Sequence, residues 1–334
     1  LRDIRTDYNR SRMTRMFSTG YASVDIIKGL KLKETLSYDY TVQKDSRYLN
    51  PLSGAGPKSG SDAQTSKGFT EYGKLLSSTS LNYTHTFAAK HHLDILAAYE
   101  LESYQSDKAM GEKAKLPSDV LLEPDNAAVL KSFVSSTQAY RMISYLSRLN
   151  YDYDNRYYIA GSYRRDGSSR LAPESRWGDF WSVSGMWHLS SEPFMEAVKP
   201  VLNDVKIRAS YGVLGEELGT ALSHIVGYNY NDGGAVIDGG LVTGSTVTGL
   251  ATDNITWGKS KILNIGIDLG FLDNRLNASF DYFNRDQTGL LASRYDVQIP
   301  EEVGFSLPQE NLNSNYARGF DASVNWRDRI GDVN

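Results

Sequence analysis

The stretch TWGKSKILNIGIDLGFLDNRLNASFDYFNRDQTGLL, residues 256–291, decides the fold class. Large apolar residues occupy every second position from Leu263 to Phe271, and Gly, Asn and Asp lie between them. The alternation resumes from Leu276 to Tyr282, after the intervening Asp273-Asn274 pair. Period-two alternation on both sides of an Asp-Asn turn predicts an antiparallel β-hairpin. Two strands are not stable alone, so the rest of the chain must supply neighbours.

The composition narrows the class of protein. The 334 residues include 22 Tyr and 29 Gly but no Cys, which excludes a disulfide framework and thiolate metal sites. A net charge of −4 gives no general attraction to nucleic acid, so no nucleic-acid partner is expected. No apolar run approaches the ~20 residues of a transmembrane helix, so only a β-barrel could span a membrane. A dozen alternating residues tilted at ~40° would rise ~25–30 Å, about the height of the apolar band of such a barrel.

Strand patterns recur along the whole chain. The expected strands are 15–27, 30–48, 71–87, 92–108, 137–153, 157–169, 178–190, 205–214, the two of the hairpin at 256–291, and 314–328. One short helical turn is expected in SSEPFMEAVKP, around Pro193. The chain is therefore predicted to be all-β, with about eleven strands.

The connections between these strands alternate in length. They are tight at 28–29, 88–91, 154–156 and 272–275, whereas 50–70, 110–136, the segment up to about 255 and 292–313 are long. Alternate connections of an up-and-down sheet lie on the same side, so one rim is trimmed and the other carries long loops. Outer-membrane barrels have this asymmetry, with short periplasmic turns and longer extracellular loops. The pattern predicts an antiparallel up-and-down transmembrane β-barrel.

Four phrases occur in order along the chain: RLNYDYDNRYYIAGSYRRDGSSRLAPESRWGDFWSVSGMWHLSSEPFM at 148–195, VKIRASYGVLG at 205–215, the phrase at 255–291, and NYARGFDASVNWRDRIGD at 315–332. Together they resemble the barrel of SusC/RagA-type TonB-dependent outer-membrane transporters. The chain departs from the family's pattern at Leu214 and Glu216, where Thr and Asn are usual. The resemblance implies that residues 1–334 form a single partial barrel domain of a larger plugged barrel. The plug domain, the TonB box and the remaining strands are expected to be absent from it.

The same resemblance implies function, location and partners. Such transporters import oligosaccharides or peptides across the outer membrane of Gram-negative bacteria. They work with a SusD-like surface lipoprotein and draw energy from the TonB complex through the plug region. The expected surroundings of the chain are therefore membrane lipid, these two partners and a polar solute, with no cofactor.

Candidate residues follow from the facing of the strands. Polar residues opposite the apolar rows are expected to face the lumen: Arg148, Asp152, Lys206, Arg208, Asp268 and Asp281. Aromatic residues in the long loops are candidates for stacking on a sugar ring: Tyr228, Tyr230 and Phe305. Aromatic residues near the tight turns suit an interfacial girdle: Tyr151, Tyr153, Tyr157, Trp187, Phe271 and Trp326.

Sites for covalent or metal chemistry are not expected. Gly258-Lys259-Ser260 lacks the earlier glycine of a phosphate-binding loop, because position 253 is Asp. The segment that begins at Asp152 has Tyr157 where a calcium loop needs Gly. The five histidines have no metal-ligand spacing, and no nucleophile elbow is present. The protein is therefore expected not to be an enzyme, with no catalytic residue and no metal site.

Two alternatives to the importer stay open on the sequence. One is a passive porin or an adhesin displayed on a barrel. The other is a soluble carbohydrate-binding all-β protein, which would place the same apolar rows in a closed core.

Overall fold

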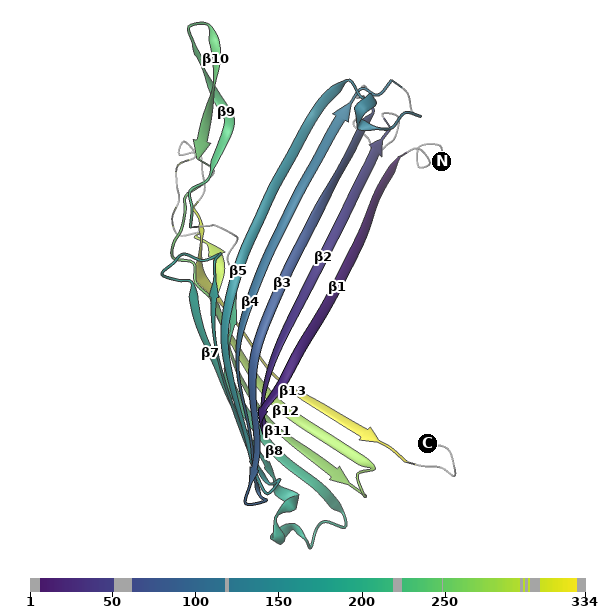
Figure 1. Ribbon diagram of the computed structural model, residues 1–334. Helices are drawn as coiled ribbons and strands as arrows, with labels where there is room; N and C mark the ends of the chain where they lie inside the picture. The colour runs from purple at the N-terminus through teal and green to yellow at the C-terminus, as the bar shows by residue number, and fades with distance from the viewer. Residues whose placement is uncertain are drawn as a thin grey trace. The chain divides into compact units, whose positions relative to one another are not determined.

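A computed structural model describes residues 7–50, 62–117, 120–218, 224–247, 249–294, 297, 300 and 307–328. Eleven strands form one sheet in the order β1-β2-β3-β4-β5-β6-β7-β8-β11-β12-β13, and β9 and β10 form a separate two-stranded sheet (Figure 1). The strands are β1 (Tyr8–Ile27), β2 (Leu30–Leu49), β3 (Gln64–Phe87), β4 (His91–Ala114), β5 (Val129–Tyr153), β6 (Tyr157–Ser168), β7 (Trp177–His188), β8 (Leu202–Glu216), β9 (Tyr228–Ile237), β10 (Gly240–Val247), β11 (Gly258–Phe271), β12 (Leu276–Ser293) and β13 (Gln309–Trp326). The expected eleven-stranded up-and-down order is confirmed.

The chain divides into two compact units. Unit 1 comprises Leu1–Ala22, Glu34–Ser78 and Leu101–Arg141, and unit 2 comprises Ser23–Lys33, Thr79–Glu100 and Met142–Asn334. Unit 1 therefore holds the parts of β1 to β5 remote from the tight turns, and unit 2 holds the remaining parts of those strands and β6 to β13.

Several expected boundaries were wrong. β5 begins at Val129, so the connection expected at 110–136 is much shorter, and β3 begins at Gln64 inside the expected loop 50–70. The segment expected to be a long loop up to 255 contains the β9–β10 hairpin. These strand ends carry Gly, Ser and Lys without strict alternation, so tertiary pairing, not local pattern, holds them extended.

Short 3₁₀ turns supply the helical residues. They are η1 (Pro124–Asn126), η2 (Leu189–Ser191) and η3 (Pro193–Met195), and the last two lie where one turn was expected. No helix among the described residues is long and apolar enough to cross a membrane.

The tight turns depend on left-handed backbone conformations. Gly29 has φ +85°, and Asp154 and Asn155 have φ 53° and 55°. Gly, Asn and Asp tolerate this region better than other residues, so these turns follow from the sequence. Ala88 and Leu272 also have positive φ, 50° and 55°. The side chains of these two residues are strained there, by roughly 1 kcal/mol or more each, which the paired strands on either side must offset.

The hydrogen-bonded register sorts side chains by polarity. Ile267 of β11 lies opposite Ile207 of β8 and Phe280 of β12, so apolar residues face one another across three strands. One position along, Asp268 lies opposite Lys206 and Ser279. Successive residues of a strand point to opposite faces, so apolar and polar rows lie on opposite faces of the sheet. The facing expected for the hairpin at 256–291 is confirmed.

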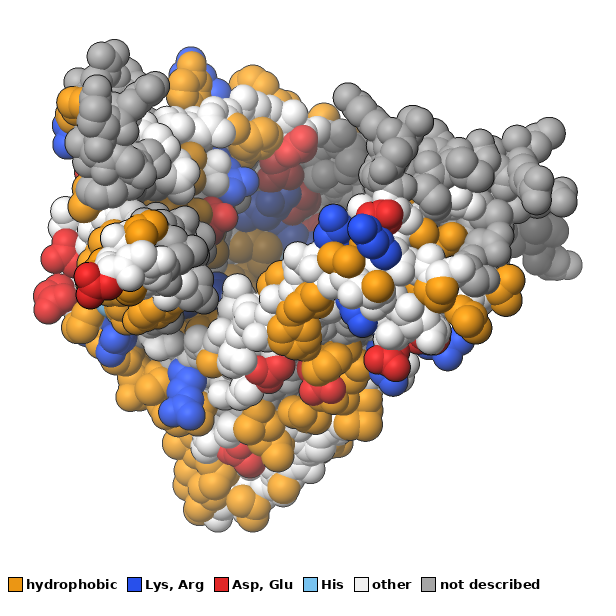
Figure 2. All heavy atoms as spheres, turned by 90° about the horizontal axis from the view of Figure 1, so that it is seen from above, with side chains coloured by type: hydrophobic (Ala, Val, Ile, Leu, Met, Phe, Trp, Pro, Cys, Tyr) orange, Lys and Arg blue, Asp and Glu red, His pale blue; other side chains and the backbone are white. Residues whose placement is uncertain are grey.

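The apolar face is not packed into a core. Ile265 is 47% exposed, Phe280 47% and Ile159 55%, although each belongs to an aliphatic or aromatic row. In the lower part of Figure 2, hydrophobic side chains crowd the surface and charged ones are sparse. Contiguous exposed apolar surface of this extent indicates a lipid or protein environment. The closed core required by a soluble all-β protein is absent from this part of the described sheet.

A small buried cluster lies on unit 2, where β6, β7 and β11 meet their long connections. Leu171, Phe180, Ile255 and Trp257 form it, and the rings of Phe180 and Trp257 meet edge to face with centroids 5.4 Å apart. Trp257 Nε1 donates to the backbone carbonyl of Arg176, 3.1 Å away. The cluster joins the connection after β6 to the segment before β11, and so fixes the start of the hairpin at 256–291.

Ile267→Arg is expected to lower barrel assembly strongly, because an arginine on the lipid face near mid-bilayer costs roughly 2–4 kcal/mol. Asn264→Arg, three residues away on the polar face, is the matched control and should assemble nearly as wild type. The measurement is the heat-resistant folded fraction of each variant in isolated outer membranes. Equal losses for the two variants would contradict the facing.

Candidate functional site

The polar face of unit 2 brings the predicted lumen residues onto one surface. Arg148 lies opposite Ser162, and Asp152 lies opposite Tyr158. The same register continues from β6 through β7 and β8 to β12. All six residues expected to face the lumen therefore lie on one face: Arg148, Asp152, Lys206, Arg208, Asp268 and Asp281. That this face lines a lumen remains a proposal.

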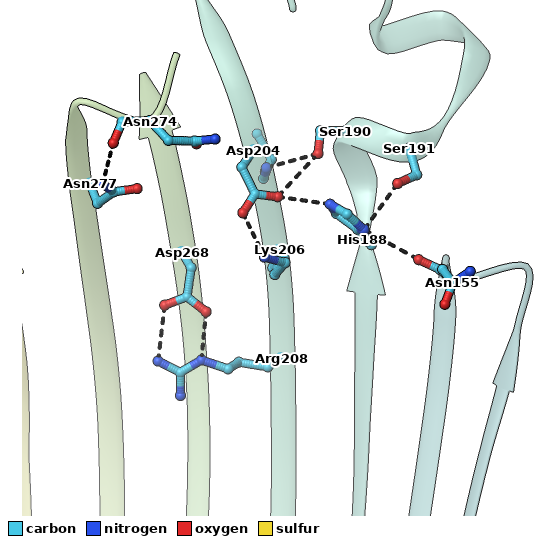
Figure 3. A network of polar contacts seen from close by, with 11 residues as sticks. Asn155, His188, Ser190, Ser191, Asp204, Lys206, Arg208, Asp268, Asn274 and Asn277 are labelled. Carbon is cyan, nitrogen blue, oxygen red and sulfur yellow. Dashed lines mark hydrogen bonds and ion pairs between the residues drawn. The ribbon is translucent and has the colours of Figure 1, made fainter. Parts of the chain in front are cut away.

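Arg208 is the centre of a charged cluster on this face. Its Nε lies 3.0 Å from Asp268 Oδ2, and its Nη1 lies 2.6 Å from Asp281 Oδ1. A further hydrogen bond of 2.7 Å joins Nη2 to Asp281 Oδ2. The guanidinium thus donates to two carboxylates from two neighbouring strands (Figure 3 shows the Asp268 half). Donation from one planar fork to both carboxylates fixes the side chain in one orientation.

Gly266 makes this cluster possible. It lies between Arg208 on β8 and Asp281 on β12 in the register. A Cβ atom at Gly266 would come within 2.8 Å of Arg208 Cζ and would also clash with Asp281 Oδ1. The guanidinium therefore occupies the space left by the missing side chain, a reason for this glycine that alternation alone did not reveal.

A second polar network lies at the tight-turn end of the same strands. Asp204 Oδ2 accepts a 2.6 Å hydrogen bond from Lys206, and its Oδ1 lies 2.8 Å from His188 Nε2 (Figure 3). His188 Nδ1 lies 3.2 Å from the backbone oxygen of Asn155 and 3.0 Å from Ser191 Oγ. The network joins the turn after β5, the end of β7, the segment containing η2 and the start of β8. Sequence reasoning missed it, because its members are separated by up to 51 positions and match no motif.

A hollow of about 620 Å³ opens on the polar face among β3 to β8 and β11. Its polar lining includes Asp94, Asn150, Asp152, Tyr158, Ser184, Arg208, Ser210 and Asn264. Asp152 Oδ2 is buried and accepts no hydrogen bond from the described residues. Arg148 Nη2 lies 3.7 Å from Asp94 Oδ1, beside this hollow. Carboxylates, amides and hydroxyls together suit a polar, neutral or cationic solute more than an anion.

A row of aromatic rings marks the tight-turn end of the opposite face. His91 stacks on Phe87 with centroids 4.8 Å apart and meets Tyr153 at 4.9 Å. The row continues from Tyr153 to Tyr157 and from Tyr157 to Trp187, at 6.4 and 6.3 Å. Amphipathic rings gathered at one level match an interfacial girdle, as expected for these tyrosines and Trp187. The histidine in this row was not expected to stack.

Glu192 anchors this aromatic row from the connection between β7 and β8. Its Oε1 accepts hydrogen bonds from the Tyr157 hydroxyl at 2.6 Å and from Trp187 Nε1 at 3.2 Å. These bonds, the Tyr157 bond first, lower the pKa of Glu192, and nearby Arg156 adds to the effect against the opposing effect of burial. The carboxylate is therefore charged at neutral pH.

The aromatic residues expected to contact substrate lie away from these polar clusters. Tyr228 and Tyr230 are on β9, and both are exposed, Tyr230 at 77%. Tyr228 lies opposite Val247 and Tyr230 opposite Ser245 on β10. Phe305 lies outside the described residues. The structure thus brings the two tyrosines onto one hairpin and does not test the third residue.

The family model and the relatives that match this sequence agree on one protein family. A family model described as "TonB dependent receptor-like, beta-barrel" matches residues 2–333. TonB-dependent receptor P39 of Formosa agariphila is 29% identical over 328 residues, which cover 96% of this chain and 30% of P39. TonB-dependent receptor SusC of Bacteroides thetaiotaomicron is 32% identical over 206 residues, 61% of this chain and 20% of SusC. The chain therefore spans less than a third of the length of these relatives.

A solved structure shares the fold. The RagAB peptide transporter superposes with a TM-score of 0.85 at 24% identity, over 98% of this chain and 35% of that one. A more distant structure, the ferric citrate transporter FecA, gives a TM-score of 0.55 at 9% identity over 95% of this chain.

Arg208→Gln is expected to destabilise the barrel, because it leaves Asp268 and Asp281 facing each other without a cation. The expected loss is about 1–3 kcal/mol, the usual cost of leaving hydrogen-bonding groups without their partner. Arg208→Gln with Asp281→Asn removes the repulsion as well and should recover part of the loss. Denaturant unfolding in detergent measures both variants, and a double variant no more stable than the single one would contradict the like-charge explanation.

Glu192 is expected to make stability depend on acid pH. Its pKa is lower in the folded state than in the unfolded state, so its contribution is complete above its ordinary carboxylate pKa and is lost as pH falls through the folded value. Wild type should be more stable than Glu192→Gln at about pH 7, and the difference should shrink at about pH 3. Thermal unfolding of both proteins across this range checks it. A difference that stays constant with pH would contradict the role of the charge.

Proposed function

The chain belongs to the TonB dependent receptor-like β-barrel family, and on that premise we propose that the complete protein imports a polar nutrient, an oligosaccharide or a similar solute. Receptors of this family are outer-membrane proteins of Gram-negative bacteria, so the chain is part of an outer-membrane β-barrel. The family membership also removes the alternative of a soluble carbohydrate-binding protein.

One observation carries the proposal: a continuous polar face across β5 to β12, opposite an exposed apolar face. In a barrel of this kind, the apolar face meets lipid and the polar face lines the interior. A solute that passes along it would meet the carboxylates, amides and hydroxyls around the 620 Å³ hollow. Such groups exchange hydrogen bonds readily with the hydroxyls of a sugar or the amides of a peptide.

The partners belong to the same proposal. We place energy coupling with the TonB complex, which would act through a region outside this chain. A SusD-like lipoprotein would cover the rim that carries the long connections, where β9 and β10 project (Figure 1). The relative SusC supports this assignment through 32% identity over 206 residues. No catalytic step is proposed, because binding followed by passage through the barrel needs no covalent chemistry.

Uptake of a labelled oligosaccharide by cells tests the proposal. Cells that express the complete protein are expected to accumulate the solute against a gradient, and collapse of the inner-membrane proton gradient should abolish this accumulation. Uptake that persists unchanged after the collapse would point to a passive porin. Cells without the gene provide the baseline.

The same assay tests the tyrosines of β9. Tyr228→Ala with Tyr230→Ala is expected to raise the KM for uptake roughly fivefold for each ring that stacks on the solute, about 1 kcal/mol each. Val236→Ala with Ile237→Ala, also exposed on β9, is the matched control. The amount of folded barrel should be unchanged in both. If the control raises the KM as much, the aromatic rings have no specific role.

A further inference from the structure

A groove lined by more cations than carboxylates lies on unit 1, on the parts of β1 to β5 that this unit contains. It has a volume of about 750 Å³. We name it the basic groove and define it by Arg10, Arg12, Lys44, Lys67, Phe69 and Phe133; the carboxylates of Asp45 and Glu71 also line it, so its cations outnumber its acidic residues by four to two. The proposed import does not use these residues.

The basic groove opens on the same face as the apolar rows. Lys44 is separated from Tyr40 and Tyr38 by even steps along β2, so the three side chains point to one side. Tyr38 and Tyr40 stack with centroids 6.1 Å apart, and Leu36 before them is 51% exposed. The other face of β2 carries Asp39, whose carboxylate pairs with Arg15 at 2.5 Å. The basic groove therefore belongs to the face that meets lipid, not to the polar face.

Three of the four cations of the basic groove form no ion pair with a described residue, although the carboxylates of Asp45 and Glu71 line the same groove. Within the described part of the chain, no carboxylate lies within ion-pair distance of Arg10, Arg12 or Lys44, and all three are exposed. Lys67 is paired with Glu123 at 2.5 Å. Asp45, the acidic neighbour of Lys44, also lines the groove, and its carboxylate accepts hydrogen bonds from Gln43 Nε2 at 3.0 and 3.1 Å. By contrast, Arg208 on the polar face is held by two carboxylates.

Aromatic and small residues give the basic groove an apolar floor. Phe133 of β5 is 67% exposed, and its Cδ2 would lie 3.6 Å from a Cβ at Gly111 of β4. Phe69 of β3, 42% exposed, lies on the same hollow. The absence of a side chain at Gly111 leaves the ring of Phe133 accessible from this face. A ligand there would meet cations and apolar surface together.

The position along β2 places the basic groove at the edge of the membrane. Lys44 comes 14 residues after Leu30, which begins β2 beside the tight turn. At ~3.3 Å per residue and a tilt of ~40°, this distance is ~35 Å along the membrane normal. The apolar band of an outer-membrane barrel is ~25 Å tall, with aromatic girdles at both edges. Tyr38 and Tyr40 fall near the far edge of the band, and the cations fall just beyond it.

We propose that the basic groove binds the phosphate-bearing head group of an outer-leaflet glycolipid, whose acyl chains lie along Leu36 and Tyr38. Arg and Lys side chains bind phosphate through charge-assisted hydrogen bonds, and basic clusters at a membrane surface hold anionic lipids. Leu36, Tyr38 and Tyr40 lie on the same face of β2 as Lys44, and this apolar and aromatic surface favours an amphiphile over a soluble anion. The proposal rests on the outer-membrane placement of the family and not on the import of any solute.

Lipid binding by the complete protein, purified from outer membranes and delipidated, tests this proposal. The probes are vesicles of phosphatidylcholine with and without 10 mol% of a bis-phosphorylated glycolipid, and inorganic phosphate alone. Wild type should bind the glycolipid vesicles selectively and should not bind phosphate at comparable concentration. Arg12→Gln with Lys44→Gln should weaken the glycolipid binding roughly thirtyfold, about 2 kcal/mol for two interfacial cations at ~1 kcal/mol each.

Arg47→Gln with Lys108→Gln is the charge-matched control, because both residues lie on the opposite faces of β2 and β4 and both are exposed. The control is expected to bind the glycolipid as wild type does. Equal weakening in both double variants would overturn the proposal, because net charge alone would then explain binding. Equal affinity for inorganic phosphate would also overturn it, in favour of a soluble anion. Uptake measured in the same variants separates the two proposals: Arg12→Gln with Lys44→Gln should import the solute as wild type does, because the proposed import does not use these residues.

Discussion

The absence of water around the sheet is the constraint on which the rest of this structure depends. In a bilayer, every backbone N–H and C=O of the spanning segment must find its partner within the protein. The antiparallel ladder from β1 to β13 supplies those partners, and its two-residue period then forces each strand to present one row to lipid and one row away from it. The apolar row of β11 can remain exposed because lipid, not a packed core, is its intended neighbour.

The two faces differ in whether their cationic side chains form ion pairs. On the polar face, cations and carboxylates neutralise one another across strands, as Arg208 does with Asp268 and Asp281. Such internal pairing leaves a surface that holds hydrogen-bonding groups at fixed positions without a strong field of one sign. In the basic groove of unit 1, Arg12 and Lys44 form no ion pair with a described residue, and we propose that an anionic lipid compensates them. This contrast between paired and unpaired cations is the physical basis on which we propose one surface for the solute and another for a lipid head group.

At the tight-turn rim, side-chain hydrogen bonds surround turn residues whose backbone conformation is strained. Residues with left-handed backbone, among them Ala88 and Leu272, close the turns at some cost. Around them, the network of His188 and Asp204 and the anchoring of Tyr157 by Glu192 join neighbouring turns through side chains. These contacts connect adjacent strands where the ladder ends, and so oppose fraying at its short rim.

The sequence by itself determined the period, and the period determined the face of each residue. Strict alternation through Leu263, Ile265 and Ile267 left only a sheet with two unlike faces, and the register confirmed it. Alternation says nothing of residues outside it, so the strand starts at Gln64 and Val129 depended on pairing with other strands of the large sheet. The β9–β10 hairpin depended on pairing between its own two strands. Only tertiary structure brought His188 to Asp204 or placed Arg208 over Gly266, because cross-strand contacts depend on register, and register is set by the turns and the neighbouring strands together.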